Sequence, residues 1–181
     1  MTTKTCAVTF GNFMGHIGHR FLIDRLLDVN ATDNFVYVGP KVGYDDPLTN
    51  GTKLDNLKRF DIPNTAFSTW GESQTPLKKI EFELFAPGKY ETIFLIVGND
   101  RCSKFQGYFS KSRLQILNQK HSVNTEIKVI GLSREYVPIS STEIRKRLRE
   151  GDFSKISEWF PQNDIWQNVK IINQVCYHKY L

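Results

Sequence analysis

The stretch VTFGNFMGHIGHRFLIDRLL, residues 8–27, joins an apolar run to an amphipathic helix through a loop rich in glycine and histidine. The helix is predicted from the apolar stripe over 21–27. Gly11, Gly15 and Gly18 allow the loop to turn sharply and bring its backbone close to a ligand. A strand, a glycine loop and a helix in succession are typical of the first unit of a parallel α/β sheet.

The rest of the chain repeats this alternation of short apolar runs and segments of helical period. ETIFLIVGND, residues 91–100, is the strongest strand signal, because Ile93 to Val97 are successive apolar residues, as in a central strand buried on both faces. Strands are predicted at 5–10, 35–38, 65–70, 91–100 and 127–132, and further helices at 52–60, 75–86, 103–119, 141–150, 153–160 and 163–176. We therefore predict a Rossmann-like, doubly wound open parallel sheet with C-terminal helices, in a single domain over 1–181.

Composition excludes several classes of protein. With 181 residues, 40% of them hydrophobic, the chain can bury one sizeable core. No run reaches the ~18 apolar residues of a membrane helix, and no signal-peptide core is present, so we expect a cytoplasmic protein. Cys6, Cys102 and Cys176 are scattered, which indicates free thiols. The net charge of +5 is spread along the chain, which does not favour nucleic-acid binding.

The glycine-histidine loop is predicted to be a phosphate site. Ligands of open parallel sheets bind beyond the carboxyl ends of the strands, where this loop lies. The helix that follows offers free N–H groups and a partial positive charge. His16 and His19 are three residues apart, so they can converge on one group. The alternatives are a glycine turn with two surface histidines, or a metal pair, for which no further ligand of suitable spacing stands out.

A second anion site is predicted in PISSTEIRKRLREG. Ser140 and Glu143 have the spacing of a capping box, and the simpler interpretation is that they only cap the helix. Ser141 and Thr142 lie four and three residues before Arg145, so two hydroxyls and a guanidinium are neighbours on the first turns. Two phosphate sites in one crevice imply a polyphosphate, for which a nucleoside triphosphate is the obvious candidate.

These motifs resemble those of a known superfamily. GNFMGHIGH resembles the GxFxPxHxGH signature of the HxGH nucleotidylyltransferases, including phage-type members, and ISSTEIR resembles their ISSTxIR signature. VGND at 97–100 is similar to the glycine-aspartate segment of nicotinate- and nicotinamide-mononucleotide adenylyltransferases. DPLTNGTK resembles their P-T-xx-R segment, with Lys53 in place of arginine. The usual proline of the first motif is absent, and two residues instead of three separate Phe13 from His16.

The resemblance implies transfer of AMP from ATP to a phosphorylated acceptor, such as nicotinate or nicotinamide mononucleotide, with release of pyrophosphate. It implies that His16, His19 and Arg145 are catalytic and that Lys53 binds an acceptor phosphate. The nucleotide-binding residues that it implies are Gly11, Phe13, Gly18, Gly98, Asp100, Ser140, Ser141 and Thr142. Mg²⁺ would bridge the phosphates with few protein ligands, so no metal site on the protein is predicted.

Simpler interpretations and other functions stay open at this point. Asp100 could be a helix N-cap, and Lys53 a solvated helix lysine. A cytidylyltransferase acting on a phospho-alcohol would usually carry an RTxGISTT pattern, which SREYVPISST lacks, whereas flavin-adenine-dinucleotide synthetases share the GNF-x-G opening. The shortened loop also permits a non-catalytic nucleotide-binding module. HIGH occurs in class I aminoacyl-tRNA synthetases, but no KMSKS-like segment is present. Relatives commonly assemble, so a homo-oligomer is possible, and no membrane partner is expected.

Overall fold

A computed structural model of the chain describes residues 4–40, 45–71, 74–133 and 139–178, except the side chains of 174 and 176–178. Within these residues, five parallel strands form one sheet in the order β3-β2-β1-β4-β5. The strands are β1 (Thr5–Gly11), β2 (Asp33–Val38), β3 (Thr65–Thr69), β4 (Thr92–Gly98) and β5 (Glu126–Leu132). The strand order reverses between β1 and β4, which creates a crevice at their carboxyl ends. The predicted Rossmann-like open parallel sheet is therefore confirmed.

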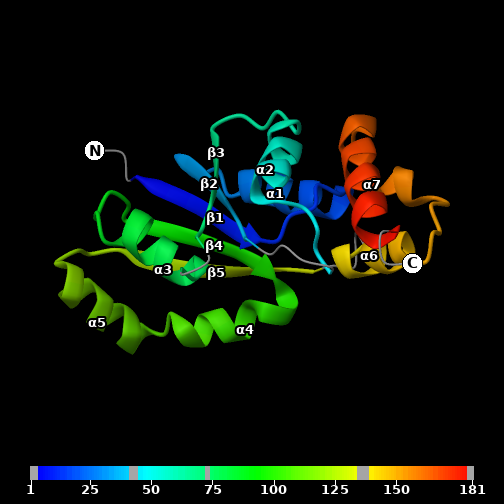
Figure 1. The fold of residues 1–181 in the computed structure, drawn as a ribbon. Helices are drawn as coiled ribbons and strands as arrows, with labels where there is room; N and C mark the ends of the chain where they lie inside the picture. The colour runs from blue at the N-terminus through cyan, green and yellow to red at the C-terminus, as the bar shows by residue number, and fades with distance from the viewer. Residues whose placement is uncertain (1–3, 41–44, 72–73, 134–138, 179–181) are drawn as a thin grey trace.

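The helices cover both faces of this sheet. They are α1 (Ile17–Asp28), α2 (Asn50–Lys58), α3 (Pro76–Ile80), the π-helical turn η1 (Glu81–Phe85), α4 (Asn99–Tyr108), α5 (Lys111–His121), α6 (Ser141–Arg149), the 3₁₀ turn η2 (Ile156–Trp159) and α7 (Asn163–His178). Figure 1 shows α1 and α2 on one side of the sheet and α4 and α5 on the other, with α6 and α7 together near the carboxyl ends of the strands. No helix in the described part of the chain is long and apolar enough to cross a membrane.

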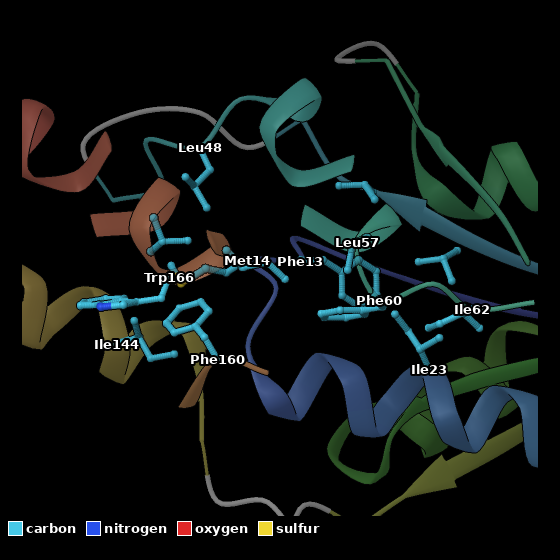
Figure 2. Close-up of a cluster of buried hydrophobic side chains, with 14 of the residues drawn as sticks. Phe13, Met14, Ile23, Leu48, Leu57, Phe60, Ile62, Ile144, Phe160 and Trp166 are labelled. Atoms are coloured by element: carbon cyan, nitrogen blue, oxygen red, sulfur yellow. The ribbon is translucent and has the colours of Figure 1, made fainter. Parts of the chain in front are cut away.

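Alternate strand residues feed two hydrophobic clusters, because successive side chains of a strand point to opposite faces. Ala7 of β1 belongs to the cluster under α1, α2, α6 and α7, whereas Cys6 and Val8 belong to the cluster under α3, α4 and α5. Figure 2 shows that Phe13 and Met14, from the glycine-histidine loop, lie inside the first cluster with Leu57 and Trp166. The loop that carries the histidines is thus anchored in the core at its middle.

Two predicted helices are wrong in detail. The single helix predicted at 103–119 is divided into α4 and α5, because Phe109 and Ser110 leave the helical conformation, with ψ angles of 40° and 158°. Gly107 and Ser110 are weak helix formers, which permits the break there. The helix predicted at 153–160 is reduced to the short turn η2.

Candidate active site

A pocket of about 440 Å³ opens at the carboxyl ends of β1 and β4. This is the crevice in which the sequence places a ligand. The pocket brings together most of the predicted site residues, which are Gly11, Phe13, His16, Gly18, His19, Gly98, Ser140, Ser141, Thr142 and Arg145. Two motifs that are far apart in the sequence therefore meet in one site.

Backbone N–H groups hold both imidazole rings of the loop. The Nδ1 atom of His19 accepts hydrogen bonds from the N–H groups of Met14, at 3.2 Å, and Gly15, at 3.1 Å. The Nδ1 atom of His16 accepts from the N–H of Gly18 at 3.0 Å, and His16 is the N-cap of α1. A ring nitrogen that accepts a hydrogen bond carries no proton, so each neutral ring has its proton on Nε2. Both histidines thus present an N–H donor at the end of the ring that is remote from the loop backbone.

The Nε2 atoms of the two histidines meet the start of α6. The Nε2 atom of His16 lies 3.1 Å from the Oγ of Ser141, and that of His19 lies 3.5 Å from the same atom. The two rings are stacked with their centroids 3.7 Å apart, and Phe13 packs edge-on against His19 at 5.0 Å. Two imidazole donors and one hydroxyl consequently converge on one region of the pocket.

The start of α6 adds further groups that suit an anion. The Oγ of Ser140 accepts the N–H of Glu143 at 3.2 Å, so the predicted helix cap is confirmed. Thr142 and Arg145 line the pocket on the following turn. The N-cap of α1, His16, and the first residue of α6, Ser141, both line the pocket, and the N-terminus of each helix carries a partial positive charge. The pocket thus combines two helix N-termini with hydroxyl, imidazole and guanidinium donors.

Lys53 and Asp100 are not among the residues that line this pocket. Lys53 is fully buried, and its Nζ lies 2.8 Å from the Oδ2 of Asp46, which is buried as well. The buried position of Lys53 fits neither of the two interpretations of the sequence, which were contact with the acceptor phosphate and a lysine exposed to solvent. Asp100 is exposed in the first turn of α4, and the N-cap of that helix is Gly98. The structure thus brings neither residue to the candidate site.

Several pocket residues were missed by the sequence analysis. The ring of Phe10 meets those of Trp70 and Phe105 edge-on, at 6.2 and 5.4 Å between centroids, and all three line the pocket. Trp70 comes directly after β3, which ends at Thr69, whereas the predicted strand runs to residue 70. Because ligands bind beyond the carboxyl ends of parallel strands, a strand predicted to end at Thr69 would have made Trp70 a candidate site residue. A Cβ atom on Gly39 would lie only 2.7 Å from the Trp70 ring, so glycine at this position makes room for the indole.

The charges around the pocket favour an anionic ligand. Among the described residues that line it, none is acidic and the cations are Arg101 and Arg145. The described residues also contain no cluster of three or more His, Cys, Asp or Glu side chains that could hold a metal ion. Mg²⁺ commonly binds through substrate phosphates and keeps several waters, so a magnesium-bound nucleotide fits these residues without a carboxylate cage.

Comparison with solved structures identifies the fold. The chain has the Rossmann-like fold of nucleotidylyltransferases, as solved structures show. A protein from Vibrio parahaemolyticus assigned as a nicotinate-nucleotide adenylyltransferase is 20% identical, with a TM-score of 0.60 over 92% of this chain and 99% of its own. Plasmodium falciparum nicotinic acid mononucleotide adenylyltransferase, complexed with NaAD, is 14% identical, with a TM-score of 0.56 over 94% of this chain and 98% of its own.

A third similar structure is Thermotoga maritima TmcAL bound with alpha-thio ATP. It is 14% identical, with a TM-score of 0.60 over 96% of this chain and 57% of its own. No protein-family model matches the chain, and no curated protein sequence matches it. The likeness therefore lies in the fold, and the function is argued from the site.

Proposed function

We propose that the chain is an adenylyltransferase that transfers AMP from ATP to a mononucleotide of nicotinate or nicotinamide, giving deamido-NAD or NAD and pyrophosphate. The observation that carries the proposal is the convergence of His16 Nε2, His19 Nε2 and Ser141 Oγ beside the start of α6. Donors arranged in this way suit a polyphosphate better than any neutral ligand. Similarity of fold to a structure that contains NaAD and to one that contains an ATP analogue supports the choice of nucleotide.

The proposed reaction is a direct displacement at phosphorus. An oxygen of the acceptor phosphate attacks the α-phosphorus of ATP, the bond to the bridging oxygen breaks, and pyrophosphate leaves with the electron pair. The N–H groups of His16 and His19 donate to the α- and β-phosphates, and Ser141, Thr142 and Arg145 bind the β- and γ-phosphates. His16, His19 and Ser141 are already held by hydrogen bonds, so these donors stabilise the charge that builds on the leaving group with little reorganisation. Mg²⁺ would be held by the phosphates that these residues bind, and it would neutralise further charge there.

The acceptor is assigned to the aromatic part of the pocket. With Lys53 buried against Asp46, the remaining described cation on the lining besides Arg145 is Arg101, at the start of α4. Arg101 is therefore proposed to take the anionic group of the acceptor, while Phe10, Trp70 and Phe105 supply apolar surface for its ring. The formation of a homo-oligomer and a cytoplasmic location stay predictions.

The reverse reaction tests nucleotide and acceptor together. The protein is incubated with Mg²⁺, pyrophosphate and, separately, NAD, deamido-NAD, FAD, dephospho-coenzyme A and CDP-glycerol, and released triphosphate is measured by chromatography. ATP from NAD or deamido-NAD is the expected result and chooses between the two acceptors. CTP from CDP-glycerol would replace adenylyl with cytidylyl transfer. Release of no triphosphate by a protein that binds ATP would contradict the proposed catalysis.

A further inference from the structure

A buried asparagine lies directly behind the glycine-histidine loop. Asn56 of α2 is fully buried, and its Nδ2 donates a hydrogen bond to the carbonyl oxygen of Met14 at 3.2 Å. Its Oδ1 has no hydrogen-bond partner among the described residues. Burying an amide oxygen without a partner is unfavourable, and leucine would fill a similar volume without that penalty. The asparagine at this position is thus explained only by the hydrogen bond that its amide group donates.

That hydrogen bond fixes one of the two peptide units that donate to His19. The carbonyl of Met14 and the N–H of Gly15 belong to the same peptide, and in a trans peptide these two groups point in opposite directions. Asn56 binds the carbonyl on one side, while the N–H of Gly15 donates to His19 Nδ1 on the other at 3.1 Å. The position of the asparagine amide is therefore transmitted through one rigid plane to the imidazole.

Gly15 makes this peptide able to flip, so an external restraint is needed. Its φ angle of +102° is a conformation that other residues rarely adopt. A Cβ at this position would lie 3.2 Å from the Cβ of Asn56 and 3.0 Å from Ile165 Cγ2 of α7. A flipped peptide would put the Met14 carbonyl beside His19 Nδ1 in place of the Gly15 N–H. The Met14 N–H, which belongs to the preceding peptide, still donates to Nδ1 at 3.2 Å, so the ring would face one donor and one acceptor there, and both tautomers would find a partner.

We propose that Asn56 is a positioning residue that selects the tautomer of His19. By holding the Met14–Gly15 peptide, it keeps the imidazole proton on Nε2, where it faces Ser141 and the phosphates of the nucleotide. The tautomer follows from the hydrogen bonds alone, and its consequence for turnover rests on the proposed function. Loss of the Asn56 amide permits the flip and lowers the fraction of His19 that presents a donor to the site.

The test compares two variants of the full-length protein. Asn56→Leu removes the restraint, and Asn173→Leu is a matched control, because Asn173 is also buried, donates its Nδ2 to a backbone carbonyl and has an unpartnered Oδ1 among the described residues. Proton and ¹⁵N NMR of histidine-labelled protein reads the tautomer of each ring, with His16→Gln and His19→Gln variants used for assignment. In parallel, kcat and KM are measured for adenylyl transfer.

We expect His19 to have an unprotonated Nδ1 and a protonated Nε2 in the wild type and in Asn173→Leu. In Asn56→Leu this pattern is replaced by a mixture of tautomers, and kcat falls about tenfold or more with little change in the KM for ATP. An Asn56→Thr variant, which keeps a hydroxyl donor, is expected to restore part of the wild-type pattern. Asn56→Ala, which has no donor, serves as the test if Asn56→Leu does not fold. An unchanged His19 pattern in folded Asn56→Leu or Asn56→Ala overturns the proposal, as does a wild-type ring protonated on Nδ1.

The two readouts separate this inference from the proposed function. If the wild type catalyses no adenylyl transfer, the proposed function fails, and the NMR comparison still decides whether Asn56 sets the His19 tautomer. If the wild type is active and Asn56→Leu changes neither tautomer nor kcat, the positioning role fails and the proposed function stands.

Discussion

Replacement of Lys53 by methionine is expected to cause a large loss of stability. The Nζ of Lys53 lies 2.8 Å from the Oδ2 of Asp46, with side-chain exposures of 0% and 2%. Removing one partner of a buried ion pair leaves the other charge buried without compensation, which typically costs about 3–5 kcal/mol. With a urea m-value of about 2 kcal/mol/M, the unfolding midpoint of Lys53→Met is expected to fall by roughly 2 M.

A double-mutant cycle shows whether the pair itself is responsible. In Lys53→Met/Asp46→Leu both charges are absent, so much of the lost stability is expected to return, and urea unfolding followed by circular dichroism measures all four proteins. The KM for the acceptor is measured in parallel under conditions in which each variant is folded. A loss below about 1 kcal/mol in Lys53→Met, together with a raised acceptor KM that Asp46→Leu does not share, would refute the reasoning and return Lys53 to the acceptor site.

Three further predictions follow from the site and the sheet. His19→Asn is expected to lower kcat by about 10²–10³ with an unchanged circular dichroism spectrum, because a donor to the transition state is lost; near wild-type turnover would remove His19 from the mechanism. Arg145→Gln is expected to raise the KM for ATP about tenfold, and Arg101→Gln is expected to raise the KM for the acceptor about tenfold; each effect corresponds to about 1.4 kcal/mol. If either variant raised both KM values equally, the proposed division of the pocket between nucleotide and acceptor would be contradicted. Hydrogen bonds from Tyr90, at 2.6 Å, and Lys89, at 3.0 Å, hold the pKa of Asp33 below its ordinary value of 3.8. The stabilisation by the ionised Asp33 is present above pH 3.8 and is lost as the pH falls through the lowered pKa. Because the carboxylate is partly exposed, Asp33→Asn should lower the free energy of unfolding by only about 1 kcal/mol at pH 7, and by less near pH 3. A loss of stability in urea unfolding that does not vary with pH would contradict this prediction.

The sheet and the positions of the two candidate phosphate-binding segments could be predicted because their signals are local. Five successive apolar residues identify β4, and the spacing of Ser140 and Glu143 identifies the start of α6. The rule that ligands bind at the carboxyl ends of parallel strands then places both motifs in one crevice. The expected meeting of the histidine loop and the serine-threonine-arginine segment agrees with the lining of the pocket.

The remaining features depend on partners from other parts of the fold. Lys53 and Asn56 are polar residues on a short helix, a pattern typical of a solvated face, and their burial depends on Asp46 and on the backbone of Met14. The sequence pattern does not show that the strand ends at Thr69, so Trp70 is read as its last residue. The break after α4 lies at Phe109 and Ser110, where no proline marks it. In each case the deciding contact is made by a segment that the local pattern does not contain.

The hydrogen bond between His16 and Ser141 joins residues that are 125 positions apart. The histidine loop is synthesised early, but its imidazole N–H groups meet the Ser141 hydroxyl only after α6 has been made and has packed against the sheet. During synthesis the two motifs therefore cannot form one site until α6 has been made. Under the proposed function, binding of the nucleotide would therefore require the folded C-terminal part of the chain and would report that folding is complete.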